Sequence, residues 1–343
     1  MTNFSKSIFL NYLEQIVKID SVSSYYEEIQ EYIVQELQRL GFAYELFYKG
    51  GVVVHVNSNE LNKLAVLAHT DTIGMMVRDV NSDGTMSLLP VGGLSPVNEI
   101  NQDVMIHTLD DRKYAATIYK RNASVHLSPS STLSSVEPDD CIAILHENSS
   151  SASDTLNMGI RPGDIVAPTP RFRVLNNGII QSRFLDDKGS VAILLTILNC
   201  IHTEKLRPHK NVDFYFTMFE ETGHGGSVLR EDVRDAIAIE MAPVGKGQHI
   251  DVHKIAISPR FGSIISNRSL TKALVNCANK NNIPYILAVS NSGGTDCSTA
   301  IVAGHDVRHT VIGFGTFASH GYELTHIDSL KAMYDLLIAY ILQ

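Results

Sequence analysis

The sequence predicts an α/β protein in which a small β domain interrupts a larger domain of alternating strands and helices. Strand-like and helical apolar segments alternate near both ends of the 343-residue chain, a pattern typical of α/β folds. Between them, short β-like runs are separated by Gly, Asp and Asn, which are turn residues. At roughly 100–200 residues per domain, the length also indicates two domains. We therefore expect one domain from residues 1–73 and 180–343 and an inserted one from residues 74–179.

The N-terminal segment predicts two helices followed by two strands. Apolar residues recur at helical spacing from Asn11 to Leu40, with a break at residues 21–24. The runs GVVVHV (51–56) and KLAVLAHTD (63–71) then indicate strands. The second run is apolar enough to be buried on both faces, as central strands of α/β sheets are.

Residues 74–179 lack helical periodicity and show short β-like runs. Two serine-rich stretches, 122–136 and 147–154, are expected to be exposed loops of this β-rich insertion. Alternation of helices and strands then resumes to the C-terminus. The expected elements are a helix at 184–201, strands at 212–220 and 236–242, a helix at 269–281 and a strand at 285–290.

Composition restricts the classes of partner. A net charge of −9 without a clustered basic patch disfavours nucleic-acid binding. Cys141, Cys200, Cys277 and Cys297 form no CxxC pair, which favours a reducing compartment over a disulfide framework. The N-terminus lacks the pattern of a signal peptide, and no run approaches the roughly 20 apolar residues that cross a bilayer. We expect a soluble cytoplasmic protein with no membrane partner.

Metal-binding and proton-carrying residue types recur where predicted strands end. They occur in HTD (69–71), in LDDKG (185–189), in FEETGHGG (219–226), at Glu240, and in SHGYELTHID (319–328). Open α/β sheets place their ligand sites at the carboxyl ends of strands. These motifs can also have purely structural roles, because HxD can be a polar strand end and paired acids can cap a helix. Their recurrence favours a metal centre, for which imidazole and carboxylate suit zinc, cobalt or manganese.

The roles follow from residue chemistry. If Glu220 and Glu221 both point inward, burying the two carboxylates costs desolvation free energy unless a positive charge lies beside them. One of them as metal ligand and the other as the base for metal-bound water is a recurrent division of labour. In LDDKG, Asp186 can bridge two cations while Asp187 supports the local geometry, and Asp71 can accept the second ring proton of the nearby histidine.

The ordered set LAHTDTIG, FLDDKG, FEETGHGG, IEMAPVG, GGTDCS and SHGYE resembles family forty-two of the metallopeptidases. This is the glutamyl-aminopeptidase and tetrahedral-aminopeptidase group, some members of which were labelled endoglucanases, and the resemblance covers essentially the whole chain. It implies a mixed-sheet α/β/α dinuclear-metal peptidase domain with a small inserted β-barrel-like domain. The implied activity is removal of N-terminal residues from peptides through a metal-bridging water.

The resemblance also implies a site with two divalent ions per subunit, zinc or cobalt and alternatively manganese. Glu220 would be the general base, and Asp71 would orient the histidine of the HTD motif. The peptide bond between Asp186 and Asp187 would be cis, and residues 293–296 would lie beside the substrate pocket. The implied metal ligands are His69 and Glu240 on one ion, Glu221 and His320 on the other, and Asp186 between them.

Two departures from the family pattern leave alternatives open. Relatives usually carry Asp where this chain has Glu240, and the variant FASHGYELTH makes His326 a competitor of His320 as ligand. This variant, together with SRFLDDKG, resembles a subgroup associated with the osmoprotectant N-acetylglutaminylglutamine amide. The family further implies a peptide or small amide substrate and a homo-oligomer, commonly a twelve-subunit tetrahedral shell.

Two other functions compete with the aminopeptidase. A carboxypeptidase or N-acyl deacylase would use the same kind of dinuclear centre on blocked substrates. A non-catalytic, metal-stabilised binding protein is the second alternative. The intact Glu220–Glu221 pair argues against that second alternative, because a structural site needs no spare carboxylate.

Overall fold

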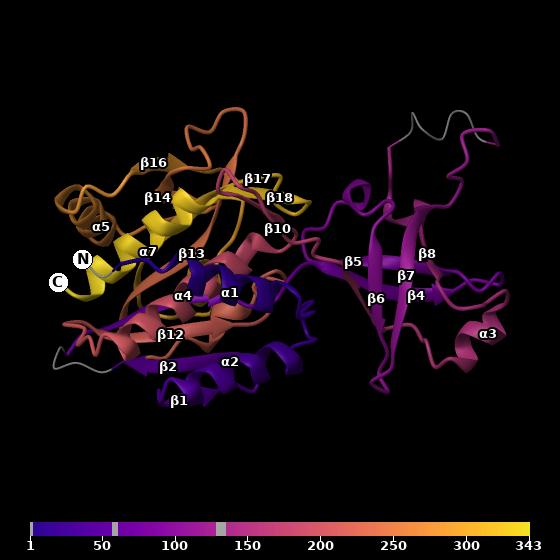
Figure 1. Ribbon diagram of the computed structural model, residues 1–343, viewed down its shortest axis with the longest axis horizontal. Helices are drawn as coiled ribbons and strands as arrows, with labels where there is room; N and C mark the ends of the chain where they lie inside the picture. Colours follow the sequence, from indigo (N-terminus) through magenta and orange to yellow (C-terminus); the bar gives the residue numbers. More distant parts are fainter. Residues whose placement is uncertain (1–2, 57–60, 128–134) are drawn as a thin grey trace. The chain divides into compact units, whose positions relative to one another are not determined.

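The computed structural model describes residues 3–56, 61–127 and 135–343, which form two compact units (Figure 1). The larger unit comprises Met1–Asp71 and Arg171–Gln343, and the smaller unit comprises Thr72–Pro170. The sequence placed the end of the insertion later, at residue 179. Strands β10 (Arg173–Val174) and β11 (Ile179–Ser182) instead belong to the sheet of the larger unit, because β11 pairs with β18 (Glu323–His326).

A twelve-stranded mixed sheet is the centre of the larger unit. Its main path runs β1-β2-β12-β3-β13-β17-β18-β11-β10, and β14 joins β15 and β16 to β17. Strands β12, β3, β13 and β17 are mutually parallel, so their carboxyl ends meet at one edge of the sheet. The remaining strands are β1 (Tyr44–Leu46), β2 (Val52–Val56), β3 (Lys63–His69), β12 (Asn211–Thr217), β13 (Val233–Val244), β14 (Ile255–Phe261), β15 (Ile264–Ile265), β16 (Tyr285–Val289) and β17 (Arg308–Phe317).

The central strand β3 is buried on both faces, as its apolar sequence predicts. Because side chains alternate across a strand, Leu64, Val66 and Ala68 enter one core cluster, while Ala65 and Leu67 enter the cluster on the other face. This two-sided burial holds the end of β3, where His69 lies, in a fixed position in the middle of the sheet.

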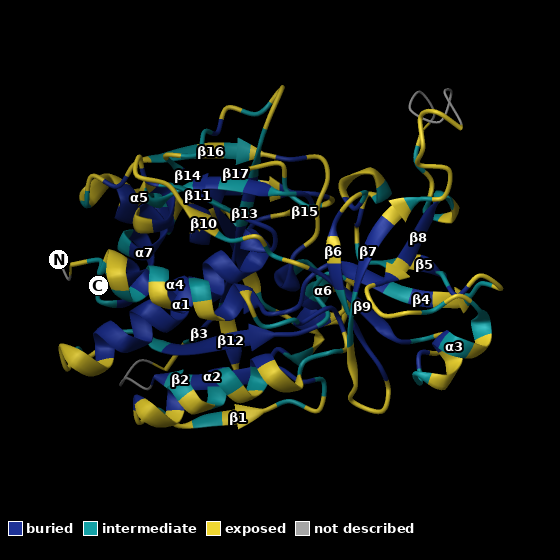
Figure 2. Ribbon diagram, turned by 45° about the vertical axis from the view of Figure 1, so that its right-hand side comes forward, coloured by how far each residue is buried: buried dark blue, intermediate teal, exposed yellow. Residues whose placement is uncertain are grey.

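Helices cover both faces of this sheet. Helix α4 (Leu185–Thr203) is buried from Leu185 to Ile201 and lies against β3 and β13 on one side and α1 on the other (Figure 2). The described residues contain no helix with the length and apolar character that a membrane span requires. The helices that pack into the core cluster of Leu64, Val66 and Ala68 are α1 (Lys6–Val17), α2 (Glu27–Arg39), α4, α5 (Arg268–Lys280) and α7 (Ile327–Ile341). Helix α6 (Asp296–Val302) packs into the cluster on the other face of the sheet.

The smaller unit is a closed six-stranded barrel with the order β4-β5-β8-β7-β6-β9. Of the two serine-rich stretches, 122–136 contains residues 128–134, which lie outside the described residues. The other, expected to be a loop, leads into the short helix α3 (Ala152–Asn157), because the Ser151 hydroxyl accepts from the Asp154 amide and caps it. The barrel strands are β4 (Gly74–Val80), β5 (Met86–Val91), β6 (Asp103–His107), β7 (Lys113–Lys120), β8 (Cys141–Leu145) and β9 (Ile165–Pro168).

Candidate active site

The parallel strands bring the predicted site residues to one edge of the large sheet. Thr217 of β12 pairs with His69 of β3, so Glu220 and Glu221 follow just beyond this histidine. Glu240 was expected to end its strand, but β13 continues to Val244 because it stays paired with β17. Glu240 therefore lies within the strand rather than at its end, and its side chain is buried.

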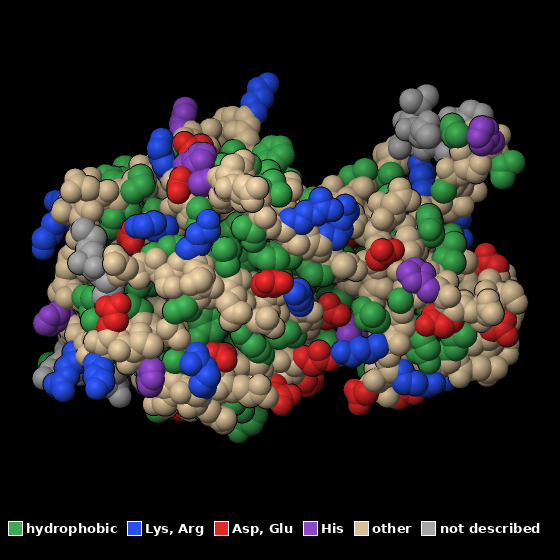
Figure 3. Space-filling model, viewed as in Figure 1, with side chains coloured by type: hydrophobic (Ala, Val, Ile, Leu, Met, Phe, Trp, Pro, Cys, Tyr) green, Lys and Arg blue, Asp and Glu red, His purple; other side chains and the backbone are tan. Residues whose placement is uncertain are grey.

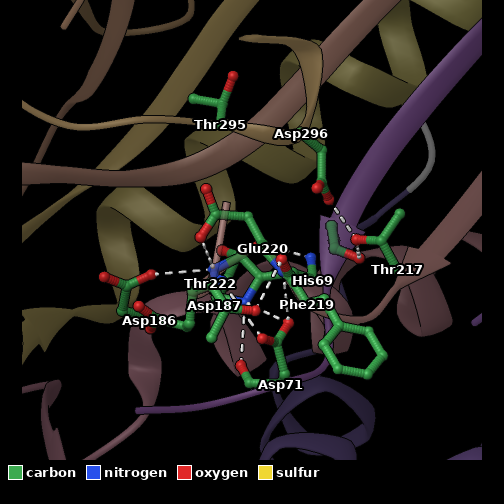
Figure 4. A network of polar contacts seen from close by, with 12 residues as sticks. His69, Asp71, Asp186, Asp187, Thr217, Phe219, Glu220, Thr222, Thr295 and Asp296 are labelled. Atoms are coloured by element: carbon green, nitrogen blue, oxygen red, sulfur yellow. Dashed lines mark hydrogen bonds and ion pairs between the residues drawn. The ribbon is translucent and has the colours of Figure 1, made fainter. Parts of the chain in front are cut away.

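The His69 imidazole lies at the centre of the cluster (Figure 4). Its Nδ1 is 2.9 Å from the carbonyl oxygen of Asp71. Because a carbonyl oxygen only accepts, Nδ1 carries the proton and the neutral ring has its lone pair on Nε2. That Nε2 faces two carboxylates, at 3.3 Å from Asp186 Oδ1 and 3.7 Å from Glu220 Oε2.

A second imidazole faces the other oxygen of the same aspartate. His320 Nε2 is 3.4 Å from Asp186 Oδ2 and 3.6 Å from Glu221 Oε2. The two oxygens of Asp186 therefore face two different histidines, which is the arrangement that a bridging carboxylate requires. The competing ligand candidate, His326, lies elsewhere, at the N-cap of α7 with its Nε2 on the Asn177 carbonyl.

Asp71 was expected to orient His69 through its carboxylate, but its backbone carbonyl makes that contact. The carboxylate instead accepts the amide protons of Glu220 at 3.1 Å and Glu221 at 3.2 Å, together with the hydroxyl of Ser23. Asp71 thus fixes the start of the glutamate loop. The difference arises because Nδ1 lies 3.6 Å from the nearest carboxylate oxygen of Asp71, beyond hydrogen-bond range.

Left-handed backbone marks the turns that carry these side chains. Phe184, Phe219 and His320 have φ values of 65°, 70° and 60°, which are uncommon for residues with a Cβ. Strained residues of this kind cluster at functional sites. The peptide bond between Asp186 and Asp187 is cis, as the resemblance implied.

Glu323 is a site residue to which the sequence assigned no role. Its buried carboxylate accepts the amide proton of Asp186 at 3.1 Å and that of His320 at 3.2 Å. One side chain therefore fixes the backbone of two predicted metal ligands. Its place within the SHGYE motif was the signal, but the role depends on a contact between distant parts of the chain.

Residues 293–296 were expected beside the substrate pocket, and one of them, Gly294, lies next to Glu220. A Cβ placed on Gly294 would be 3.9 Å from Glu220 Oε1, and one on Gly225 of the glutamate loop would touch Asp296. The Asp296 carboxylate accepts the hydroxyl proton of Thr217, which ties the first residue of α6 to the end of β12 (Figure 4). This packing leaves Glu220 bordered by a glycine, with room beside its carboxyl group.

The acids of the cluster crowd one another electrostatically. Burial, followed by neighbouring carboxylates, raises the pKa of Glu220 to about 8 and raises the pKa of Glu240 and Asp187. Burial and then the charge of Asp186 likewise raise the pKa of Glu221. Burial alone would raise the pKa of Asp186, but hydrogen bonds with His320 and His69 lower it instead. With all of these acids ionised, the cluster would hold more negative charge than its two histidines balance.

The donor set fits divalent cations. The buried oxygens Asp187 Oδ1 and Glu221 Oε1 have no hydrogen-bond partner among the described residues. Two groups of residues each offer ligand atoms that lie within 4.8 Å of one another inside the group: His69, Asp186 and Glu221 form one, and His69, Asp187 and Glu240 form the other. His69 belongs to both groups, but its single lone pair can bind only one ion. Imidazole and carboxylate donors together suit zinc, cobalt or manganese. A cation at each group would satisfy both the orphaned oxygens and the lone pair of His69.

Comparisons with known proteins identify the family and agree with the fold. The family model described as M42 glutamyl aminopeptidase matches residues 50–336. YhfE of Bacillus subtilis (strain 168), which carries an aminopeptidase name, is 32% identical over 343 residues and is covered to 99%, as is this chain. Among solved structures, the TET aminopeptidase of a marine sediment Thaumarchaeota archaeon superimposes with a TM-score of 0.89 at 19% identity, over 98% of this chain and 96% of its own. The Pyrococcus horikoshii TET1 peptidase superimposes with a TM-score of 0.86 at 22% identity, over 98% and 99%. The chain belongs to the M42 glutamyl aminopeptidase family.

Proposed function

We propose that this protein is a dinuclear metallo-aminopeptidase that hydrolyses the N-terminal peptide bond of peptides, with Glu220 as general base. One observation carries the proposal. Asp186 lies between His69 and His320, and a further carboxylate, Glu220, faces the same imidazole of His69. A structural metal site needs no such spare carboxylate. The family and the names of its members support the aminopeptidase direction.

The metal-holding residues in this proposal are His69, Glu240 and Asp187 at one position, and His320 and Glu221 at the other, with Asp186 shared. When bound, two divalent ions supply positive charge that polarises a scissile carbonyl and acidifies water. Zinc, cobalt and manganese all suit these donors. Asp187 joins the predicted set because its ligand atom groups with those of His69 and Glu240.

Glu220 moves the protons in this mechanism. Its side chain is 12% exposed, so water and substrate can reach it, whereas Glu221 is 5% exposed. In the metal-free chain, burial raises the pKa of Glu220 above that of an ordinary carboxyl group, which favours its taking up a proton. Glu220 takes a proton from the attacking water and delivers it to the leaving amine. Asp71 keeps the carboxylate in place by binding the Glu220 amide.

A substrate panel tests the proposal. Purified protein is stripped with a chelator, supplied with zinc, cobalt or manganese, and assayed on free and N-acetylated aminoacyl amides and dipeptides. We expect cleavage of free N-termini that depends on added metal. N-acetylglutaminylglutamine amide belongs in the blocked set, because the variant SHGYE motif resembles the subgroup associated with it.

The panel also separates the competing functions. Cleavage of blocked substrates alone would move the assignment to a carboxypeptidase or N-acyl deacylase. Metal binding without hydrolysis of any substrate would support a binding protein and would contradict the proposal.

We further propose that the chain forms a homo-oligomer. The Pyrococcus horikoshii TET1 peptidase can assemble into a tetrahedron or a large octahedral shell, and it shares this fold along nearly its whole length. We expect the inserted barrel to supply contacts between copies of the chain or to line the substrate pocket.

A further inference from the structure

A second cluster of metal-ligating side chains lies outside the candidate active site. His253, His326 and Asp328 offer ligand atoms that lie within 4.8 Å of one another. His253 comes from the loop between β13 and β14, and the other two residues open helix α7. Figure 3 shows histidine and acidic side chains gathered on the surface of the larger unit.

Both imidazole rings of this cluster point a nitrogen at the carboxylate of Asp328. Asp328 Oδ2 is 3.1 Å from Nδ1 of His253 and 3.1 Å from Nδ1 of His326. The two imidazole rings are adjacent, with centroids 4.3 Å apart. With metal–ligand bonds of about 2.0–2.1 Å, the ligand atoms of a tetrahedral zinc ion are about 3.3 Å apart. The observed separations are close to that spacing.

The tautomer of His326 leaves Nδ1 as a lone-pair donor. Its Nε2 is 2.7 Å from the carbonyl oxygen of Asn177, so Nε2 carries the proton of the neutral ring. Nδ1 then accepts the Asp328 amide at 3.2 Å, a long bond, while a carboxylate oxygen stands 3.1 Å away. A lone pair and a carboxylate repel each other at this distance unless a cation or proton lies between them.

The histidine is held in this orientation by a distant part of the chain. A Cβ placed on Gly178 would lie 2.5 Å from His326 Nε2, which shows that the ring packs directly against the β10–β11 turn. The carbonyl of Gly178 also accepts the Ile327 amide at 3.0 Å. This is the support that metal-binding histidines characteristically have, with the second ring nitrogen on a backbone carbonyl.

We propose that His253, His326 and Asp328 form a separate binding site for one zinc-type divalent ion. Two imidazoles and one carboxylate are zinc ligands, and the exposure of His253 and Asp328 leaves the fourth position to water. The alternative is a proton on His326 Nδ1, with neutral His253 donating its Nδ1–H to Asp328 at 3.1 Å. A single ion would instead neutralise Asp328 and join the β13–β14 loop to the start of α7. This site shares no residue with the centre around Asp186, so it stands independently of the proposed hydrolysis.

Zinc counting on the full-length protein tests the site. The wild type and the variants His253→Ala and Asp328→Asn are stripped with a chelator and dialysed against buffered free zinc, and bound zinc per chain is measured by atomic emission. His249→Ala is the matched control, because His249 is an exposed histidine of the same loop that is outside the cluster. We expect one zinc ion fewer in His253→Ala and Asp328→Asn, or affinity for that ion lowered at least about tenfold, and no change in His249→Ala.

Chemical modification locates the ion independently. Diethyl pyrocarbonate acylates accessible imidazoles, and mass spectrometry reports the modified residues. Zinc should protect His253 and leave His249 reactive. Equal zinc content together with equal zinc affinity in the wild type and His253→Ala, or equal modification of His253 with and without zinc, would overturn the proposal.

Discussion

At the scale of single residues, Asp186 and Glu323 together determine the geometry of the candidate site. Asp186 offers one oxygen to His69 and the other to His320, and Glu323 holds the backbone amides of Asp186 and His320. A carboxylate that accepts the backbone amides of metal ligands affects metal binding by fixing the orientation of those ligands. Asp186 would therefore contact the ions directly, whereas Glu323 would position the residues that contact them.

Glu220→Gln tests the general base. The amide has nearly the same shape but cannot take a proton, so kcat should fall by about a hundred- to ten-thousand-fold. Metal content measured by atomic emission should equal that of the wild type, because the proposed ligands remain. Substantial residual activity in Glu220→Gln would move the base to another residue.

Glu323→Gln tests the positioning role. One side-chain oxygen becomes an NH2 group, which would face a backbone N–H and lose one of the two hydrogen bonds. Metal affinity, measured by competition with a chelator, should fall about 10–100-fold. Excess metal should restore much of the activity. Lost activity with unchanged metal affinity would show that Glu323 acts otherwise.

The raised pKa of the cluster acids predicts how the metal-free protein responds to pH. The pKa of Glu220 is about 8 in the folded chain against an ordinary value of 4.5, owing first to burial and then to neighbouring carboxylates. The folded state therefore binds more protons than the unfolded state between these values, and this contribution to stability is lost as pH rises through about 8.

We therefore expect the melting temperature of chelator-treated protein to fall from pH 5 to pH 8, measured by differential scanning fluorimetry. Added zinc should reduce this fall and release protons, because the bound cation favours the ionised carboxylates. A metal-free melting temperature that rises over this range would contradict the role assigned to these acids.

At the scale of elements, the packing of α4 fixes the site. Asp186 and Asp187 have non-helical backbone angles at the start of α4, and the helix after them is buried as far as Ile201. The chain therefore cannot shift at the aspartates without disturbing the core. The glycine of this helix, Gly189, lies against the ring of Phe314 in β17. The strand that precedes His320 therefore packs directly on the helix that carries Asp186.

Gly189→Ala should destabilise the fold. The added Cβ would be 2.7 Å from Phe314 Cζ, so the ring or the helix must move. Overpacking of this kind costs roughly 1–3 kcal/mol, which urea unfolding would measure. Gly245→Ala is the control, because a Cβ there meets no atom within 4 Å. Equal stability of both variants would mean that the core accommodates the methyl group.

At the scale of the whole molecule, the chain combines a peptidase unit with a closed barrel. Closing a sheet into a barrel removes its unpaired edges, so the insertion needs no strand from elsewhere to complete it. Its outer surface is then available for contacts with other copies of the chain.

Light scattering coupled to gel filtration tests the assembly. The mass in solution should be a multiple of the 37.8 kDa chain mass. A twelve-subunit species would match the tetrahedral group that the motifs resemble. A single 37.8 kDa species across the concentration range would contradict the homo-oligomer.

Local patterns in the sequence were enough to predict the fold class and the residue types at the strand ends. Hydrophobic periodicity is a local property, so β3, β12 and α4 were all expected close to where they occur. The confirmed family followed from motifs spaced along the whole chain. Residue types at strand ends indicated a metal centre, because parallel strands share one carboxyl edge.

Which side chains meet became clear from the folded chain. It placed His320 rather than His326 beside Asp186, gave the Asp71 carboxylate to the glutamate loop, and assigned a contact to Glu323. It also assigned β10 and β11 to the large sheet. Each of these depends on contacts between residues far apart in the chain, which local periodicity does not encode. Strand pairing and core packing determine them, and both exist only in the folded molecule.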